Sequence, residues 1–496
     1  MQMENISWIN DCARSGQGMD VVIISAETKV QEEFWQYHLQ RLLGDILKPN
    51  AKVIAVCEDW HGGAGNGLGS LYAYQKAQDK ARVLYGIDIC DLQRKGAAIA
   101  LYHTAGQGKR LSPLTGSENN NKSAVKMPAY VGRPKEYMKL LDAVIKQTAM
   151  FATSRKGRLS VFWGDQIFIP SISPKYTPKH HVDILFRLED VPTEQQWQKE
   201  KWDQYGLIAV DSQGNPQLID KTSYAAFQSL LATQQISAAN GMGVSLGSFS
   251  LSYPMVMALL EEFRKELLSK KEYFDSDPFF WMPTTLPRET YVHMMQVKKI
   301  PLAKAEAHYT RMQNFKEKFE KQQPSLKFIG AFNIGKDSYW WDYGTVDLYF
   351  SNLMKLVEDT PEGEAKRLFF GLKLDYLTHS ILLNSHITSG KPKNSLIVGS
   401  HCGQVDVDHC MILNSTLGKA EGQNCLFYNV KEKEKLTLPA NSIRADVFLE
   451  ERHVELTTQT GRDGKNDWAV RLPTNNVSYE EVYRLNQAVC RANSSN

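Results

Sequence analysis

Glycines and basic residues follow an apolar stretch in residues 103–128, HTAGQGKRLSPLTGSENNNKSAVKMP. The preceding residues 97–103, AAIALYH, predict a buried strand. Gly106 and Gly108 carry no β-carbon, so the chain after Ala105 can turn sharply and bring successive backbone N–H groups towards an anion. The spacing therefore predicts an anion-binding loop at the end of a strand.

Three cationic side chains come next along the chain. Arg110 offers a planar fork to phosphate oxygens, whereas Lys122 and Lys126 offer point charges. Three cations after a glycine turn suit a polyanion, so we expect this loop to bind a triphosphate. A strand, a glycine turn and solvated basic residues form the competing interpretation, because short glycine motifs often match by chance.

An aspartate follows a second apolar strand. Residues 158–163, RLSVFW, predict a buried strand that runs into Gly164 and Asp165. Ligands of open α/β sheets bind at the carboxyl ends of the strands, and a carboxylate there is a hard oxygen ligand that suits Mg²⁺. Taken alone, Asp165 fits a loop-capping turn equally well. A second aspartate, Asp342, ends an aromatic strand in residues 339–345, YWWDYGT.

Another glycine-dense segment opens a predicted helix in residues 62–81 and contains Gly65, Gly67 and Gly69. A helix N-terminus presents free N–H groups and the positive end of the helix dipole, which suit a phosphate or the edge of a nucleobase. This segment is therefore a second candidate nucleotide contact. A tight connection between a strand and a helix explains the glycines equally well.

The residues AGQGKRLSPLT, followed by Lys122, resemble the signature of the sugar-1-phosphate nucleotidyltransferases, AGGxGTRLxPxT with a downstream lysine. The longer pattern HTAGxGxRLxPL…ENNNKxxVKxP resembles the plastid-type UDP-glucose pyrophosphorylases of plants and their bacterial relatives. The chain departs from this signature at Gln107, Lys109 and Ser123, where glycine, threonine and proline are usual. None of these departures removes a charge that the predicted phosphate site needs.

The resemblance implies roles for the charged residues. Arg110 and Lys122 would hold the triphosphate. The stretch 339–345 is similar to the family motif YWxDxGT, which implies that Asp342 joins Asp165 as a ligand of Mg²⁺. Magnesium is the only cofactor that the resemblance implies.

The sugar phosphate is expected at a later hairpin, residues 205–224, which resembles the family element YGxxxxDxxGxxxxxxEKP. The resemblance implies that Lys221 pairs with the sugar 1-phosphate and that Asp220, in place of the usual glutamate, contacts sugar hydroxyls. Asn240 and Gly243 resemble a family strand, NxGxYxF, that also contacts sugar hydroxyls. An ordinary exposed ion pair is the competing interpretation of Asp220 and Lys221.

We therefore expect a nucleotidyltransferase that makes an NDP-sugar and pyrophosphate, with UTP and glucose 1-phosphate favoured as substrates. The glycine segment 62–69 precedes the signature, as in fucose-1-phosphate guanylyltransferase, so GTP with fucose 1-phosphate is an alternative. A non-catalytic nucleotide-sugar-binding regulatory subunit is a second alternative. It is disfavoured because Lys122, Asp165 and Asp342 are all present.

The elements that position these residues alternate between apolar strands and amphipathic helices, with a strand at 20–26, a helix at 29–46 and a strand at 51–58. This alternation predicts an α/β fold, and the resemblance implies a Rossmann-like nucleotidyltransferase domain with a mostly parallel mixed sheet. A chain of 496 residues is too long for a single core, so more than one domain is expected.

The C-terminal third carries an internal repeat in residues 379–432, in which a short apolar stretch recurs every fifteen residues. One phase of the repeat holds small residues and another holds apolar residues: Ser380, Ser395, Cys410 and Cys425, and Leu382, Ile397, Ile412 and Phe427. A strand that recurs at a fixed interval predicts the coils of a small parallel β-helix. We place a nucleotidyltransferase domain at 1–372, the β-helix at 373–450 and a C-terminal extension at 451–496. Because the cysteines fall on stacked positions of the repeat, they predict packing rather than a zinc site.

Composition limits the partners. The chain has 58 Lys and Arg against 55 Asp and Glu, and a net charge of +3 gives no electrostatic reason to expect a nucleic acid or an anionic membrane. No apolar run reaches transmembrane length and no signal-peptide pattern opens the chain, so a cytoplasmic protein is expected. Seven scattered cysteines predict reduced thiols. Association of several copies through the β-helix stays open.

Overall fold

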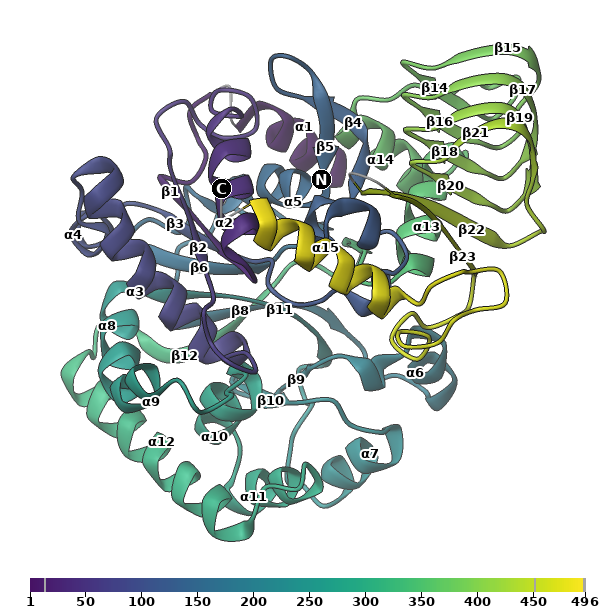
Figure 1. Cartoon of the computed structure of the whole chain (residues 1–496). Helices are drawn as coiled ribbons and strands as arrows, with labels where there is room; N and C mark the ends of the chain where they lie inside the picture. Colours follow the sequence, from purple (N-terminus) through teal and green to yellow (C-terminus); the bar gives the residue numbers. More distant parts are fainter. Residues whose placement is uncertain (13–14, 450–451, 494–496) are drawn as a thin grey trace.

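The structure of the chain, a computed structural model, describes residues 1–12, 15–449 and 452–493. Its main body is built around a mixed nine-stranded sheet in the order β10-β9-β11-β6-β3-β1-β2, with β8 paired to β11 and β12 paired to β8 (Figure 1). The strands of this sheet are β1 (Val21–Ala26), β2 (Lys52–Cys57), β3 (Ile99–His103), β6 (Arg158–Trp163), β8 (His180–Glu189), β9 (Leu207–Val210), β10 (Pro216–Ile219), β11 (Met242–Ser252) and β12 (Lys327–Asn333). The α-helices of the main body are α1 (Gln2–Cys12), α2 (Lys29–Gln40), α3 (Gly65–Tyr85), α4 (Ile89–Arg94), α5 (Leu140–Thr148), α6 (Glu194–Glu200), α7 (Tyr224–Ala232), α8 (Tyr253–Glu262), α9 (Arg264–Ser269), α10 (Met282–Thr285), α11 (Arg288–Val297), α12 (Leu302–Gln322), α13 (Val346–Met354) and α14 (Pro361–Phe370).

Strands β2, β1, β3 and β6 pair in parallel, so their carboxyl ends lie at one edge of the sheet. Strands β1 and β3 are buried along their whole length, because helices cover both faces of the sheet. Val22 of β1 packs in one apolar cluster with Trp35 of α2, and Val21 packs in another with Leu68 of α3. The predicted α/β class and its parallel strands are confirmed. The antiparallel partners of β6, β9 and β10 make the sheet mixed.

One predicted helix is longer than the observed one. The helix predicted at 29–46 ends at Gln40, and Gly44, with φ of +81°, turns the chain soon afterwards. Helices α8 and α9 follow each other directly, and Phe263, with φ of −100° and ψ of 17°, leaves the helical conformation between them.

A small antiparallel pair brings two distant parts of the chain together. Strand β7 (Gln166–Ile169) pairs with β13 (Tyr339–Asp342), and Asp342 lies opposite Gln166 in the register. Since β7 follows directly after Asp165, this pairing delivers Asp342 to the edge of the sheet where β6 ends.

The repeat region, residues 379–437, folds into two stacks of parallel strands. Its register advances by fifteen residues, as in Leu396 opposite Met411 and Met411 opposite Leu426. One stack contains β14 (Ile381–Leu383), β16 (Leu396–Val398), β18 (Met411–Leu413) and β20 (Leu426–Tyr428), and continues into β22 (Ser442–Leu449) and the antiparallel β23 (Arg452–Gln459). The other stack contains β15 (His386–Gly390), β17 (His401–Asp408), β19 (Thr416–Gln423) and β21 (Lys431–Thr437).

Two side-chain ladders explain the repeat chemically. Asn384, Asn414 and Asn429 have positive φ, as do Asn394 and Asn424 at a second corner, and asparagine tolerates this left-handed conformation better than most residues. The Oγ of Ser395 accepts a hydrogen bond from the backbone N–H of Cys410 in the next turn, at 3.1 Å, and other small residues repeat this contact. The small residues of the repeat therefore accept hydrogen bonds from backbone N–H groups of the next turn, fifteen residues later.

The apolar core is continuous across the predicted domain boundary at residue 372. Leu396, Met411 and Leu426 of the first stack belong to the same cluster as the side chains of α5 and α13. Ile397, Phe427 and their neighbours fill a separate core between the two stacks. The repeat region is therefore packed firmly against the main body.

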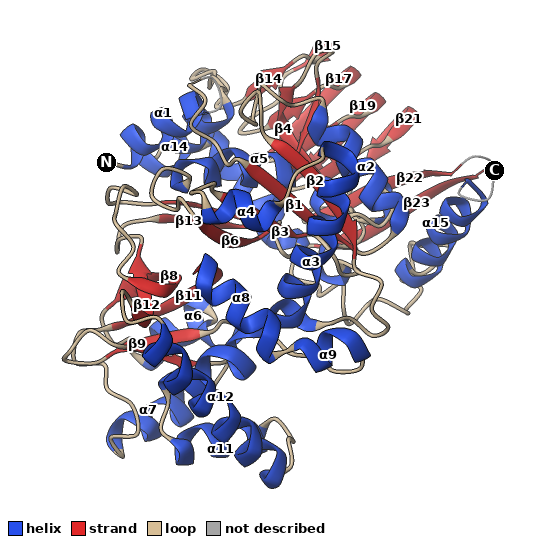
Figure 2. Cartoon of the chain, turned by 90° about the vertical axis from the view of Figure 1, so that its left-hand side faces the viewer, coloured by secondary structure: helices blue, strands red, loops and turns tan. Residues whose placement is uncertain are grey.

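The repeat region lies at one end of the molecule, and α7, α11 and α12 lie at the other (Figure 2). A C-terminal helix, α15 (Tyr479–Asn493), follows β23 and packs on β22 and β23 through Val482 and Val447. The six cysteines whose side chains the structure describes are free thiols. Across the described ranges, none of the helices combines the length and the hydropathy needed to cross a bilayer.

We expect Phe427→Ala to lower the free energy of unfolding by about 3–5 kcal/mol, because it leaves a cavity in a core where Phe427 is 0 % exposed. Leu382→Ala is the matched control, since Leu382 occupies the same phase of the repeat and is 47 % exposed. Urea unfolding followed by circular dichroism measures both. Equal losses in the two variants would contradict this account of the repeat core.

Candidate active site

The signature loop, residues 104–122, begins where β3 ends. Its first backbone N–H groups, those of Thr104 and Ala105, donate to the carbonyl oxygen of Ser25, which ties the loop to β1. Gly106 and Gly108 have φ of +111° and +59°. A β-carbon at Gly108 would lie 2.8 Å from the Cβ of Lys122, so only glycine permits this approach. The predicted glycine turn is present, and it brings the start of the loop against Lys122.

Four charged residues predicted from separate parts of the sequence converge beyond this loop. The Nζ of Lys122 lies 3.3 Å from Oδ2 of Asp165. A β-carbon built on Gly344 would lie 3.0 Å from Oδ1 of Asp342, 3.8 Å from Oδ2 of Asp165 and 3.9 Å from Nη2 of Arg110. Two cations and two carboxylates therefore surround one small volume at the carboxyl end of β6.

Backbone contacts place the two carboxylates. The N–H of Gly164 donates to the carbonyl oxygen of His103, and a β-carbon there would lie 2.8 Å from Oγ of Ser123. Gly164 is therefore a packing residue that lets β6 approach the signature loop. The N–H of Tyr343 donates to the carbonyl oxygen of Asp165 at 2.9 Å, which extends the pairing of β7 with β13.

The electrostatics of this pair are unfavourable for two ionised carboxylates. Burial, followed by repulsion from Asp165, raises the pKa of Asp342 to about 6. The N–H of Gly344, the hydroxyl of Tyr205 and the charge of Arg110 partly offset this shift, because each favours the ionised carboxylate. The pair is held together by the backbone against its own repulsion.

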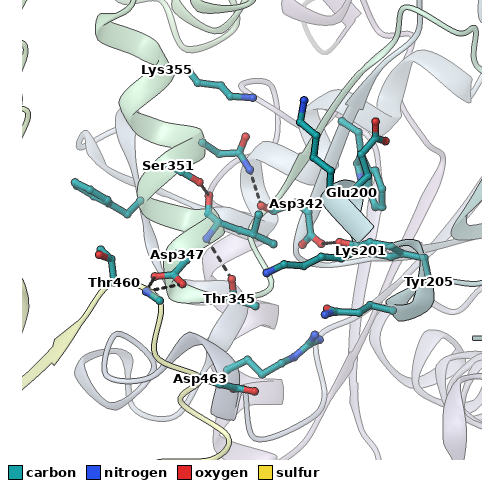
Figure 3. A pocket seen from close by; sticks show the side chains of 18 of the residues that line it. Glu200, Lys201, Tyr205, Asp342, Thr345, Asp347, Ser351, Lys355, Thr460 and Asp463 are labelled. Carbon is teal, nitrogen blue, oxygen red and sulfur yellow. Dashed lines mark hydrogen bonds between the residues drawn. The ribbon is translucent and has the colours of Figure 1, made fainter. Parts of the chain in front are cut away.

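Sequence reasoning missed three residues that support Asp342. The hydroxyl of Tyr205 donates to Oδ2 of Asp342 at 3.2 Å, and the two side chains face each other in Figure 3. The side chain of Asn352 donates to the carbonyl oxygen of Asp342, and the buried ammonium of Lys366 donates to Asn352. Tyr205 is the first residue of the hairpin predicted to bind the sugar phosphate, and that position was the only sequence feature that pointed to it. Nothing local to residues 352 or 366 indicated their contacts.

A cavity of about 880 Å³ opens onto Asp342 and Arg110 (Figure 3). Its wall combines the main body with the C-terminal segment, and includes Arg187, Lys199, Lys201, Thr345, Thr460 and Asp463. The N–H of Gly461 donates to both carboxylate oxygens of Asp347 at 2.9 Å, which fixes that part of the wall. The cavity has room for a molecule larger than a phosphate group, beside the convergent charges.

Lys126 does not join this cluster. Its ammonium pairs with the carboxylate of Glu118 and lies 5.4 Å from the ring centre of Tyr428 in the repeat region. Burial lowers the pKa of Lys126, and Glu118 opposes that shift. Its contacts are those of a buried ion pair between the signature loop and the repeat region, not of a group facing the cavity.

The glycine segment before α3 is also engaged internally. The N–H of Gly67 donates to the carbonyl oxygen of Phe274, and the N–H of Asn66 donates to the carboxylate of Asp275. A β-carbon at Gly65 would lie 2.6 Å from the carbonyl carbon of Phe274, and one at Gly69 would lie 3.2 Å from Oε2 of Glu58. These glycines allow close packing, which is the competing interpretation stated for the segment. The N–H groups of Asn66, Gly67 and Leu68 already have acceptors.

The residues predicted to bind the sugar phosphate do not line the cavity at Asp342. The carboxylate of Asp220 forms an ion pair with Lys298 at 2.5 Å. The charges of Asp220 and Lys221 both interact with the buried carboxyl group of Asp277. Burial, with repulsion from Asp220 and Asp275, raises the pKa of Asp277 to about 7, and Lys221 opposes this. None of these side chains lines the cavity at Asp342.

Asn240 and Gly243 have structural contacts. The exposed Asn240 donates to the carbonyl oxygen of Asp211 at 2.7 Å, across the turn of the hairpin. A β-carbon at Gly243 would lie 2.0 Å from the carbonyl oxygen of Arg187, so glycine allows β11 to approach β8 there.

The carboxylate pair fits a divalent cation. Asp165 and Asp342 present hard oxygen donors. Burial and then repulsion from Asp165 raise the pKa of Asp342, and a bound cation would offset that repulsion. Within the described residues, no group of three or more His, Cys, Asp and Glu side chains forms a metal centre. Mg²⁺ keeps several waters and needs only one or two carboxylates beside substrate phosphates, so a pair of aspartates matches its usual coordination.

Comparisons with known proteins give no closer guide. No protein-family model and no curated protein matches the sequence. HddC from Yersinia pseudotuberculosis aligns with a TM-score of 0.27 and 13% identity over 69% of this chain and 81% of that chain. HddC complexed with GMP-PN gives a TM-score of 0.26 and 10% identity over 68% and 100% of the two chains. A "Putative Glucose-1-Phosphate Thymidylyltransferase" from Bacillus anthracis, in complex with a sucrose, gives 0.20 and 12% over 66% and 90%. TM-scores this low carry no conclusion about fold or activity.

We expect Asp342→Asn to raise the melting temperature in EDTA at pH 8. The pKa of Asp342 is higher in the folded protein than in the unfolded chain, so ionised Asp342 destabilises the folded protein. This destabilisation is complete above about pH 6 and disappears as the pH falls to the pKa of the unfolded chain. The stabilisation by the variant should therefore shrink between pH 6 and pH 4, which differential scanning fluorimetry measures.

Adding Mg²⁺ at pH 8 should raise the melting temperature of the wild type more than that of Asp342→Asn. Asp79→Asn is the matched control, since Asp79 is an exposed carboxylate on α3 and does not line the cavity at Asp342. An equal response to Mg²⁺ in all three proteins would refute cation binding by this pair.

Proposed function

We propose that this chain is a sugar-1-phosphate nucleotidyltransferase, which joins a nucleoside triphosphate and a sugar 1-phosphate to give an NDP-sugar and pyrophosphate. The convergence of Arg110, Lys122, Asp165 and Asp342 is the observation that supports this function. Arg110 and Lys122 lie in the signature loop, Asp165 lies between β6 and β7, and Asp342 ends β13. The two basic side chains suit polyanions, and the two carboxylates suit a metal cation. The resemblance of the signature loop to plastid-type UDP-glucose pyrophosphorylases favours UTP and glucose 1-phosphate.

The reaction requires stabilisation of negative charge on the two substrates rather than proton transfer to or from the nucleophile. The nucleophile is an oxygen of the sugar 1-phosphate, which is already an anion at neutral pH, and it attacks the α-phosphorus while pyrophosphate leaves. Two polyanions must therefore be held in line against their repulsion. Arg110 and Lys122 are positioned to offset the charge of the triphosphate and of the leaving group.

Asp165 and Asp342 would hold Mg²⁺, which when bound offsets phosphate charge and helps to orient the reacting oxygens. Tyr205 and the N–H of Gly344 keep Asp342 oriented towards that position. The cavity beside Asp342, with Arg187, Lys199 and Lys201 on its wall, offers space and positive charge for the sugar phosphate.

The test is pyrophosphate release from the full-length protein with Mg²⁺. Glucose 1-phosphate is offered with UTP, GTP, ATP and CTP in turn, and then fucose, galactose, mannose and N-acetylglucosamine 1-phosphates replace it. We expect release with UTP and glucose 1-phosphate. Pyrophosphate release only with GTP and fucose 1-phosphate would establish the guanylyltransferase alternative. No release with any substrate pair would favour a non-catalytic binding subunit.

Two substitutions test the residues. Asp165→Asn should remove nearly all turnover, and Lys122→Met should lower kcat/KM by roughly 10²–10³-fold, the usual effect of losing one preorganised charge stabiliser. Asp79→Asn and Lys135→Met are matched controls, since both residues are exposed and neither lines the cavity at Asp342. Melting temperatures confirm that the variants fold. Near-normal turnover by a folded Asp165→Asn would contradict the proposed role of this aspartate.

A further inference from the structure

The C-terminal strap, residues 460–488, returns to the main body and contacts the signature loop. Figure 1 shows its helix α15 crossing beside the main body after the chain leaves β23. The side chain of Asn120 donates to the carbonyl oxygen of Tyr483 at 2.8 Å, and that of Asn486 donates to the carbonyl oxygen of Gly116 at 2.9 Å. A β-carbon at Gly116 would lie 3.1 Å from Cγ1 of Val482. The middle of the signature loop is therefore packed directly against α15.

A second contact fixes the start of the loop. The Nζ of Lys109 lies 5.0 Å from the ring centre of Trp468, and a β-carbon at Gly464 would lie 2.4 Å from the carbonyl oxygen of Lys109. Trp468 and Tyr483 are 8 % and 7 % exposed, and their rings are 5.5 Å apart. Both aromatic side chains are thus buried between the strap and the loop, next to Arg110.

Tyr483 also connects the strap to the phosphate-binding side of the loop. Its hydroxyl donates to Oε1 of Glu27, the residue that follows β1, at 2.9 Å. Burial raises the pKa of Glu27, and the hydrogen bond from Tyr483 and the charge of Lys122 oppose that shift, so Glu27 is within electrostatic range of both. Removal of the Tyr483 hydroxyl would leave Glu27 without this donor, close to Lys122.

The strap also accounts for two departures from the signature that the chain resembles. Gln107 and Lys109 stand where glycine and threonine are usual. The side chain of Gln107 interacts with the hydroxyl of Tyr483, and Lys109 lies over Trp468. Both unusual side chains therefore have partners on the strap, which is an observation independent of the backbone contacts.

We propose that Tyr483 and Trp468 are positioning residues that hold the signature loop in its ligand-binding conformation before the ligand arrives. The identity of that ligand as a nucleoside triphosphate rests on the proposed function. A loop with glycines at positive φ loses conformational entropy when it is ordered, and contacts that order it beforehand reduce the entropy lost on binding. The strap thus contributes to affinity for the triphosphate without touching it.

Hydrogen exchange without any ligand tests the positioning directly. Tyr483→Phe removes a single oxygen atom, and Trp468→Leu removes the ring that Lys109 contacts. We expect faster exchange in peptides from residues 104–122 in both variants, and unchanged exchange in β11. Tyr479→Phe is the control, because Tyr479 lies on the same helix but donates to Thr457 of β23. Unchanged exchange in the signature loop of Tyr483→Phe would overturn the proposal.

Kinetics test the consequence for the ligand. We expect Tyr483→Phe to raise KM for the triphosphate by about fivefold, as for the loss of one hydrogen bond, with little change in kcat or in KM for the sugar 1-phosphate. A lower kcat with an unchanged KM for the triphosphate would overturn the effect on affinity. If the wild type releases no pyrophosphate with any substrate pair, the proposed function fails, while the exchange experiment still decides whether the strap holds the loop.

Discussion

The enforced proximity of Asp165 and Asp342 is the constraint on which the candidate site depends. Two carboxylates at short range repel each other, and burial adds to the penalty, so the pKa of Asp342 rises to about 6. The backbone pairing of β7 with β13 brings these two residues together. Arg110, Lys122 and Tyr205 are placed where they offset part of the repulsion. A cation bound between the two carboxylates would remove the rest of this repulsion.

The repeat region and the strap stabilise the loop that supplies the two cations. Glu118 and Lys126 form a buried ion pair beneath Tyr428, and removing either partner would leave an uncompensated charge in the interior. The strap covers the opposite part of the loop through Tyr483 and Trp468. The loop between β3 and β4 (Lys126–Val131) is thus held from two sides by segments that come much later in the sequence.

Glycines with similar sequence patterns serve two different purposes in this protein. Gly106 and Gly108 have left-handed conformations that shape the signature loop. Gly67 and Gly243 instead allow another part of the chain to approach closely, and their neighbours are backbone carbonyls rather than solvent. A glycine-rich stretch before a helix is therefore insufficient evidence for an anion site, because the protein's own acceptors can satisfy the helix N–H groups.

Local features could be predicted from the sequence alone: the buried parallel strands, the glycine turn after β3, the fifteen-residue register of the repeat, and the residue types that converge at the site. These follow from periodicity and from backbone preferences that neighbouring residues set. Which of these residues meet depends on the tertiary structure. The fold pairs Asp342 with Asp165, turns Lys126 towards Glu118, leaves Lys221 out of the cavity wall, and packs Tyr483 against the signature loop. Local spacing carries little information about such contacts, because they depend on where distant strands pair and which segment returns to cover them.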